Sequence, residues 1–281
     1  MTLQAQYNGK SKNEIDWNLF VGDTYEILKA MPDNVKFDCV VTSPPYFWLR
    51  DYGVESQLGH ENTVADYVNS IARIMDEVYR LLTPSGLLFL NIGDTYYSGK
   101  GESQGIDRKS SKRRFGLRAV DKSGGMGIGL ERKSMIGIPW RVAIEMTQRH
   151  WALRSSIIWN RVHSLQESVK DRPRRSYEFM FMFSKERFYY FDRNPLQEHD
   201  EEDIWSIPAS KTNNGIDTAP FPEELVARCL EIGCRPGGTV LDPFSGSGTT
   251  LKVAIQSGRS ATGIELNQEF CEYAVRQLRQ I

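Results

Sequence analysis

The sequence has few of the residues that build disulfide frameworks or metal sites. Its four cysteines include no Cys-x-x-Cys pair, and its four histidines lie far apart in the chain. We therefore expect reduced core thiols and no bound metal. No apolar run approaches the length that spans a membrane, and no signal-peptide pattern is seen near the first residue. Together these absences favour a soluble protein of the cytoplasm.

A large net charge of either sign is also absent. The 35 Lys and Arg residues are balanced by 36 Asp and Glu residues, so the formal net charge is −1. Affinity for a polyanion would thus need a local basic surface. With 281 residues, 40% of them hydrophobic, the chain can build one large α/β domain or two small ones. No repeat or low-complexity linker divides it, so we expect a single domain over residues 1–281.

Apolar runs of strand length alternate with segments of helical period. Strand, helix and strand in this rhythm indicate right-handed parallel crossovers. Residues 176–184 and 187–192 predict a hairpin about Lys185-Glu186, at an antiparallel edge of the sheet. The polar residues 1–16 are expected to be frayed or loosely docked. The predicted strands span residues 17–23, 37–41, 87–93, 154–160, 239–242 and 261–264, and the predicted helices span 24–31, 63–82, 139–147, 222–232 and 249–257.

Residues 42–46, Thr-Ser-Pro-Pro-Tyr, carry the clearest chemical signal. The apolar strand before them must stop, because proline removes hydrogen-bond donors and disfavours a helical conformation in the residue before it. Ser43 and Tyr46 are thus held at a stiff strand exit. The Ser43 hydroxyl and the Pro44 carbonyl can accept hydrogen bonds from an exocyclic amine, and Tyr46 can stack on its ring. The alternative is a rigid turn with a tyrosine packed beneath it.

A second signal lies in the C-terminal third. Pro243 to Thr250 form a tight glycine-rich turn between a predicted strand and a predicted helix. Glycines let the backbone approach a ligand closely, and a helix N-terminus favours negative groups. Glu265 ends the next strand, nineteen residues after Gly246, where an acidic residue can hold ribose hydroxyls. Leu251 stands where a dinucleotide motif has its third glycine, which weakens a dinucleotide interpretation.

Asp23 follows the first predicted strand of the chain. Ligands bind at the carboxyl ends of strands in open α/β sheets, so its carboxylate is placed to accept a hydrogen bond from a ligand amine. The alternative role, a cap on the helix that follows, has equal support.

Two loops concentrate basic residues that the net charge conceals. Within 108–118 six residues are basic and none is acidic, and residues 161–175 form a second basic stretch. We expect both loops to face nucleic-acid phosphates, the first as a mobile arm within 94–135; a solvated linker is the alternative. The candidates are Arg108, Lys109, Lys112, Arg113, Arg114, Arg118, Arg161, Lys170, Arg172, Arg174 and Arg175.

In this order, the two motifs resemble those of the permuted, β-type group of DNA amino-methyltransferases, in which the catalytic motif precedes the S-adenosylmethionine motif. The resemblance implies a Rossmann-like fold: a doubly wound, mostly parallel seven-stranded sheet with an antiparallel edge hairpin and a circularly permuted motif order. It extends over residues 15–281, and it is weakest across 94–135 and 193–217. It rests on Gly22-Asp23, Thr-Ser-Pro-Pro-Tyr at 42–46, Leu-Arg-Asp-Tyr-Gly at 49–53, Asp-Pro-Phe-Ser-Gly-Ser-Gly-Thr-Thr at 242–250 and Gly-Ile-Glu-Leu-Asn at 263–267.

The resemblance also implies roles for single residues in binding S-adenosylmethionine. Glu265 would hold the ribose hydroxyls of the cofactor, and Asp23 would accept from its adenine amine. The other implied cofactor contacts are Phe221, Pro222, Asp242, Phe244, Gly246, Ser247, Gly248, Thr249 and Asn267.

Ser43, Pro44 and Tyr46 would form the pocket for the target base, with Pro45 stiffening it. The implied partner is double-stranded DNA, contacted by Arg50 and by insertions at 94–135, 161–176 and 193–217. A place in a restriction-modification system of a prokaryote or phage follows from the same resemblance, which also admits a homodimer.

Ser43 stands where related enzymes often carry Asp or Asn, and serine there is associated with cytosine N4 as the target. Cytosine is therefore the preferred prediction, while adenine N6 stays open because both amines need a facing acceptor. Methylation at cytosine C5 is excluded, because no cysteine follows a proline. An RNA methyltransferase, an NAD-dependent oxidoreductase and a non-catalytic DNA-binding module are the remaining alternatives.

Overall fold

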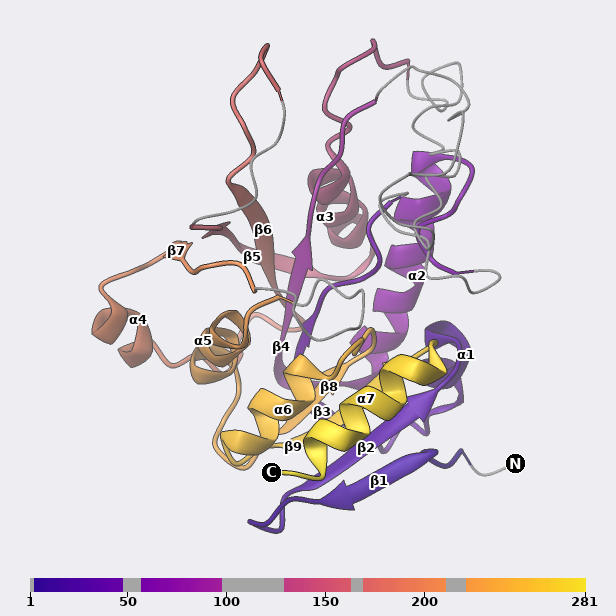
Figure 1. Ribbon diagram of the computed structural model, residues 1–281, viewed down its shortest axis with the longest axis vertical. Helices are drawn as coiled ribbons and strands as arrows, with labels where there is room; N and C mark the ends of the chain where they lie inside the picture. Colours follow the sequence, from indigo (N-terminus) through magenta and orange to yellow (C-terminus); the bar gives the residue numbers. More distant parts are fainter. Residues whose placement is uncertain (1–2, 48–56, 98–128, 163–168, 211–220) are drawn as a thin grey trace.

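The computed structural model describes residues 3–47, 57–97, 129–162, 169–210 and 221–281 (Figure 1). Their strands form one sheet in the order β1-β2-β9-β8-β3-β4-β6-β5-β7. β1 and β6 are antiparallel to their neighbours, and the remaining pairs are parallel. The strands are β1 (Tyr7–Lys10), β2 (Asp16–Val21), β3 (Phe37–Thr42), β4 (Leu82–Ile92), β5 (Ala152–Asn160), β6 (Tyr177–Ser184), β7 (Ile204–Ser206), β8 (Thr239–Asp242) and β9 (Ser260–Glu265).

Helices cover both faces of this sheet (Figure 1). Alternate residues of the central strands point to opposite sides, so Val40 lies in one buried core and Val41 in the other. This confirms the predicted α/β architecture with a mostly parallel sheet. Among the described helices, none has the length and apolarity needed to cross a membrane. One face is covered by α1 (Thr24–Ala30), α2 (Val64–Leu81) and α3 (Ile138–Arg149), and the other by α5 (Glu223–Gly233), α6 (Thr249–Gln256) and α7 (Gln268–Leu278), with the short α4 (Asn194–His199) beside α5.

Local sequence signals set the N-termini of three predicted helices. Asp23 caps α1, because its side chain accepts a hydrogen bond from the Glu26 backbone N–H at 3.0 Å. Thr63 caps α2 in the same way through the Asp66 backbone N–H, and Pro139 lies in the first turn of α3. The capping role considered for Asp23 is therefore confirmed.

The expected number of seven strands is wrong, and the extra pairings lie at the two edges of the sheet. Residues 7–10, predicted to be frayed, pair with β2 as β1. Gly9 packs directly on the Trp17 ring there, since a Cβ at Gly9 would lie 2.6 Å from a ring carbon. At the other edge β7 pairs with β5. With three residues, β7 is too short to show a strand period within the segment 193–217.

The predicted hairpin about Lys185-Glu186 is also wrong. Residues 187–192 form no strand; they run past the sheet, held by hydrogen bonds from Tyr190 N–H to Ser85 O and from Asp192 N–H to Ile232 O. β6 is an interior strand that pairs with β4 on one side and β5 on the other. Because β6 is antiparallel, its first residues lie at the edge where the parallel strands end.

A buried carboxylate joins β3 to β8 at that edge. The Thr42 hydroxyl donates to Asp242 Oδ1 at 2.7 Å, and the Thr250 hydroxyl donates to Oδ2 at 2.6 Å. The Phe244 backbone N–H donates to Oδ1 at 3.1 Å. Burial raises the pKa of Asp242 to about 6, although these three donors oppose the rise. Asp242 therefore links the ends of both strands to the start of α6.

The raised pKa predicts how stability depends on pH. Folded Asp242 binds a proton more tightly than the unfolded chain does, so its contribution to the free energy of unfolding decreases as pH rises from about 4 to 7. The shift of roughly two pKa units corresponds to about 3 kcal/mol. Urea unfolding should show that the free energy of unfolding of the cofactor-free wild type decreases by this amount from about pH 4 to 7, relative to Asp242→Asn, which cannot ionise.

Asp203→Asn, the same change at an exposed carboxyl group, is measured in parallel as the matched control. A difference between Asp242→Asn and the wild type that is constant across the range, or that follows the same course as the control, would contradict the assigned role of Asp242.

Candidate active site

The two motifs end neighbouring strands of the sheet. β3 pairs in parallel with β8, with Cys39 opposite Val240 and Val40 opposite Leu241. Ser43 to Tyr46 and Pro243 to Gly248 therefore leave the sheet at the same edge. We call this edge, formed by the carboxyl ends of the parallel strands, the rim. A doubly wound sheet binds ligands there.

The Ser-Pro-Pro-Tyr segment is fixed by its neighbours. The Tyr67 hydroxyl of α2 donates to the Pro45 carbonyl oxygen at 2.9 Å. Tyr46 packs on the backbone of Gly93, where a Cβ would lie only 2.6 Å from a carbon of the tyrosine ring. Pro44 is buried, and Ser43 and Tyr46 are half-buried. The position of the tyrosine ring thus depends on the absence of a side chain at residue 93.

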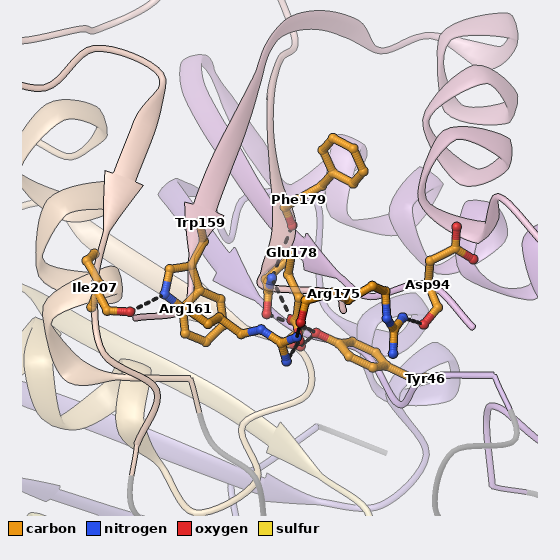
Figure 2. A network of polar contacts seen from close by, with 10 residues as sticks. Tyr46, Asp94, Trp159, Arg161, Arg175, Glu178, Phe179 and Ile207 are labelled. Atoms are coloured by element: carbon orange, nitrogen blue, oxygen red, sulfur yellow. Dashed lines mark hydrogen bonds and ion pairs between the residues drawn. The ribbon is translucent and has the colours of Figure 1, made fainter. Parts of the chain in front are cut away.

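The Tyr46 hydroxyl enters a polar network, drawn in Figure 2. It lies 2.6 Å from Glu178 Oε2, 3.1 Å from Asn91 Oδ1 and 3.4 Å from Ser43 Oγ. Arg161 donates to the other oxygen of Glu178 at 2.8 Å. Burial, and then the neighbouring Glu178 carboxylate, hold the pKa of Tyr46 well above its usual value, so its phenol is protonated at neutral pH.

The glycine-rich turn has the backbone that its sequence predicts. Gly246 and Gly248 have φ values of 51° and 85°, which glycine adopts without strain. Gly248 immediately precedes α6, and a Cβ there would lie 2.8 Å from the Ala274 Cβ. A Cβ at Gly246 would meet no atom within 4 Å, so open space adjoins the backbone at this position. Ser247 and Thr249 lie beside these glycines and are half-buried, as is Phe244.

Glu265 closes the turn from β9. Its carboxylate accepts from the Gly246 backbone N–H at 2.8 Å and from the Asn267 backbone N–H at 2.8 Å. Burial raises its pKa. The Gly22 N–H donates to the Glu265 carbonyl oxygen at 2.9 Å, which brings the end of β2 to the same place. Open space at Gly246 beside an acidic side chain leaves room for a ligand at this turn.

Several predicted cofactor residues have structural partners of their own. Asn267 caps α7 by accepting from the Glu269 and Phe270 backbone N–H groups. Asp242 lies beneath the turn, with both oxygens bound to threonine hydroxyls. Phe221 is buried in the core on the α5 side, and Pro222 immediately precedes α5. The contacts of these four residues with the cofactor stay predictions.

The predicted DNA-contacting residues that the structure describes divide into two groups. Arg161 points inward to Glu178, Arg175 donates to the Asp94 carbonyl oxygen, and Arg172 stacks on the Tyr96 ring with its guanidinium carbon 3.8 Å from the centroid. Lys170 and Arg174 are exposed. The other candidates lie outside the described residues: Arg50, Arg108, Lys109, Lys112, Arg113, Arg114 and Arg118.

Three polar residues near the rim were not predicted: Asn91, Asp94 and Glu178. Asn91 and Glu178 each interrupt an apolar strand, and a polar residue in a buried strand is a signal that could have identified them. The Asp94 carboxylate accepts from the Gly137 and Ile138 backbone N–H groups and so anchors the start of α3. Within the described ranges, no group of three or more His, Cys, Asp or Glu side chains could hold a metal ion.

Comparison with known sequences identifies relatives over nearly the whole chain. The model of the N6/N4 methyltransferase family, which is described as DNA methylase, matches residues 37–276. The type II methyltransferase M.Cfr9I of Citrobacter freundii is 40% identical over 268 residues, which cover 93% of this chain and 87% of the relative. M.SmaI of Serratia marcescens is 39% identical over 269 residues, covering 92% and 90%.

Solved structures show the same fold. The PvuII DNA methyltransferase, described as cytosine-N4-specific, matches with a TM-score of 0.71 at 19% identity, over 93% of this chain and 86% of that one. A putative DNA modification methylase of Thermus thermophilus, solved with S-adenosyl-L-methionine, matches with a TM-score of 0.63 at 25% identity, over 92% and 93%. Because the family model matches most of this chain and M.Cfr9I is 40% identical over 93% of it, the chain belongs to the N6/N4 DNA methylase family.

Proposed function

We propose that this protein methylates the exocyclic N4 amine of a cytosine that is flipped out of duplex DNA. The observation that carries the proposal is the position of Ser43. Its hydroxyl lies at the end of β3, half-buried, within 3.4 Å of the Tyr46 hydroxyl and on the same rim as the glycine-rich turn. The order of the two motifs along the chain supports the permuted, β-type group.

The chemistry requires an acceptor that faces the amine. The lone pair of an exocyclic amine is delocalised into the ring, which makes the amine a poor nucleophile. The Ser43 hydroxyl and the Pro44 carbonyl can accept its hydrogens and favour a tetrahedral nitrogen. A serine hydroxyl is too weak a base to remove a proton beforehand, so Ser43 acts as an acceptor. Tyr46 supplies a stacking face that offsets part of the cost of base flipping.

S-adenosylmethionine is the cofactor of this family, and when bound it supplies an electrophilic methyl group. Glu265 would hold the ribose hydroxyls, and the turn from Gly246 to Thr249 would surround the methionine end. Asp23, exposed at the end of β2, would accept from the adenine amine. The sulfonium group of the cofactor carries a positive charge. A positive charge near a buried carboxylate favours the ionised form of that carboxylate.

Duplex DNA would lie across the rim. Lys170 and Arg174 are exposed on a segment that leads into β6, and they are placed to contact phosphates. M.Cfr9I and M.SmaI are both named type II methyltransferases, which supports a role in a restriction-modification system. Adenine N6 is the second candidate target, because the family includes both chemistries and adenine needs the same acceptor.

Mass spectrometry of nucleosides tests the proposal directly. DNA treated with the protein and methyl-labelled S-adenosylmethionine should yield labelled N4-methylcytosine. Ser43→Ala should lower the rate by about 100-fold or more, because the amine loses its fixed partner. Affinity for the cofactor and for DNA should be retained, as measured by calorimetry and by fluorescence anisotropy.

Ser257→Ala, at the far end of α6, is the matched control and should leave the rate unchanged. Labelled N6-methyladenine instead of N4-methylcytosine would contradict the cytosine target. Undiminished transfer by Ser43→Ala would contradict the role of the hydroxyl.

Gly93→Ala tests the placement of Tyr46. The added Cβ would overlap the tyrosine ring, which must move. A displacement of about 1 Å at a reacting site can cost on the order of 100-fold in rate. We therefore expect a large loss of methyl transfer, measured with a fixed excess of DNA, while affinity for S-adenosylmethionine changes little.

Gly233→Ala is the control for overpacking, because its Cβ would lie 2.4 Å from the Phe89 ring inside the core. Both variants should lose about 1–3 kcal/mol of stability, but Gly233→Ala should keep the transfer rate of the folded protein. An equal loss of transfer in both would show that overpacking acts only through stability.

A further inference from the structure

We propose that Glu178 is a positioning residue that, through Tyr46, sets the direction of the hydrogen bond that the Ser43 hydroxyl donates to the Tyr46 oxygen, so that the Ser43 hydroxyl presents its lone pairs to the target amine. The inference rests on the proposed function and assigns a role to a side chain outside the Ser-Pro-Pro-Tyr motif. It holds for either amine, since both require an acceptor.

Strand direction brings Glu178 to this place. β6 is antiparallel, so its second residue lies at the rim, opposite Trp159 near the end of β5. Asn91, near the end of β4, donates from Nδ2 to Glu178 Oε2 at 3.3 Å and to the Phe179 carbonyl oxygen at 3.1 Å. Figure 2 shows the side chains of Tyr46, Glu178 and Arg161 converging. A parallel strand in this position would have carried the residue to the opposite edge.

The number of hydrogens then decides which group donates. A tyrosine hydroxyl has a single hydrogen, and two acceptors lie near it: Glu178 Oε2 at 2.6 Å and Asn91 Oδ1 at 3.1 Å. A hydrogen bond to a charged oxygen is shorter and stronger than one to a neutral oxygen, so the hydrogen is directed to Glu178. The Tyr46 oxygen is then left to accept.

Ser43 is the donor that faces this oxygen, at 3.4 Å. When the serine hydrogen points inward to Tyr46, the lone pairs of Ser43 Oγ are turned toward the rim. If the phenol instead donated to Ser43, the serine hydrogen would point outward and oppose the hydrogens of the incoming amine. The orientation of the Ser43 hydroxyl therefore depends on Glu178, through Tyr46.

Arg161 supports this arrangement from the opposite side. It donates to Glu178 Oε1 at 2.8 Å, and the side chains of the pair are 22% and 14% exposed. Both carboxylate oxygens thus act as acceptors. Arg161 also donates to the Arg175 carbonyl oxygen at 3.3 Å, which joins the residue just after β5 to a residue just before β6. The predicted phosphate contact of Arg161 is accordingly replaced in this proposal by a role within the protein.

The alternative is that Glu178 only braces β4 and β5 against each other. A brace would affect folding and cofactor binding, and its effect would not depend on the tyrosine hydroxyl. A positioning role requires that hydroxyl. The two are separated by comparing Glu178→Gln, Tyr46→Phe and the double variant.

Glu178→Gln should lower kcat for methyl transfer by about 10-fold or more, since the uncharged amide can donate to the phenol as well as accept from it. The KM for DNA and the affinity for S-adenosylmethionine should change less than about twofold. The double variant should be no slower than Tyr46→Phe alone, because Glu178 acts through the missing hydroxyl. Glu186→Gln, exposed beyond the end of β6, is the matched control.

A second measurement is independent of activity. In protein labelled with ¹³C at tyrosine Cζ, the Tyr46 resonance is assigned by its loss in Tyr46→Phe. Glu178→Gln should shift that resonance, and Glu186→Gln should not. An unshifted resonance would overturn the proposal. This measurement does not depend on methyl transfer, so it applies even if the wild type proved inactive on DNA. Such inactivity would contradict the proposed function separately. Additive losses in the double variant, or wild-type kcat in Glu178→Gln, would also overturn it.

Discussion

The parallel pairing of β3 with β8, tied at its end by the buried Asp242 carboxylate, is the constraint on which the site depends. Two segments about 200 residues apart in sequence leave the sheet side by side because their strands are neighbours. Thr42 and Thr250 donate to the two oxygens of one carboxylate. Displacement of β3 relative to β8 would remove the Thr42 donor from that buried carboxylate, at a cost of about 1–3 kcal/mol. The Asp242 carboxylate thus joins the two motifs and also fixes their positions relative to each other.

The two halves of the site are shaped by opposite means. On the β3 side the chain is stiff: two prolines, the hydrogen bond from Tyr67 to Pro45, and the contact of Tyr46 with Gly93 leave little freedom. On the β8 side, glycines at positive φ fold the backbone tightly and leave open space beside Gly246. A stiff surface suits an amine that must be held in one orientation. An open backbone turn suits a bulky ligand.

The sequence was sufficient where one local pattern controls one element. Thr-Ser-Pro-Pro-Tyr, the glycine-rich turn and Asp23 could all be placed, because strand ends and caps depend on a few adjacent residues. Pairing between distant strands could not be predicted in the same way. The apolar period of β6 is the same in an edge hairpin and in the interior of the sheet, so its neighbours β4 and β5 were missed. Glu178 was missed with them, because its nearness to Tyr46 follows from the direction of β6.

The account is tested most directly by a structure of the protein with S-adenosylhomocysteine and a duplex that contains its target base. We predict the cofactor sulfur at the turn from Gly246 to Thr249, and the flipped base against Tyr46. The exocyclic amine should lie within hydrogen-bond distance of Ser43 Oγ, roughly 3 Å. A cofactor bound away from this turn, or an amine out of reach of Ser43 with the cofactor in place, would contradict the account.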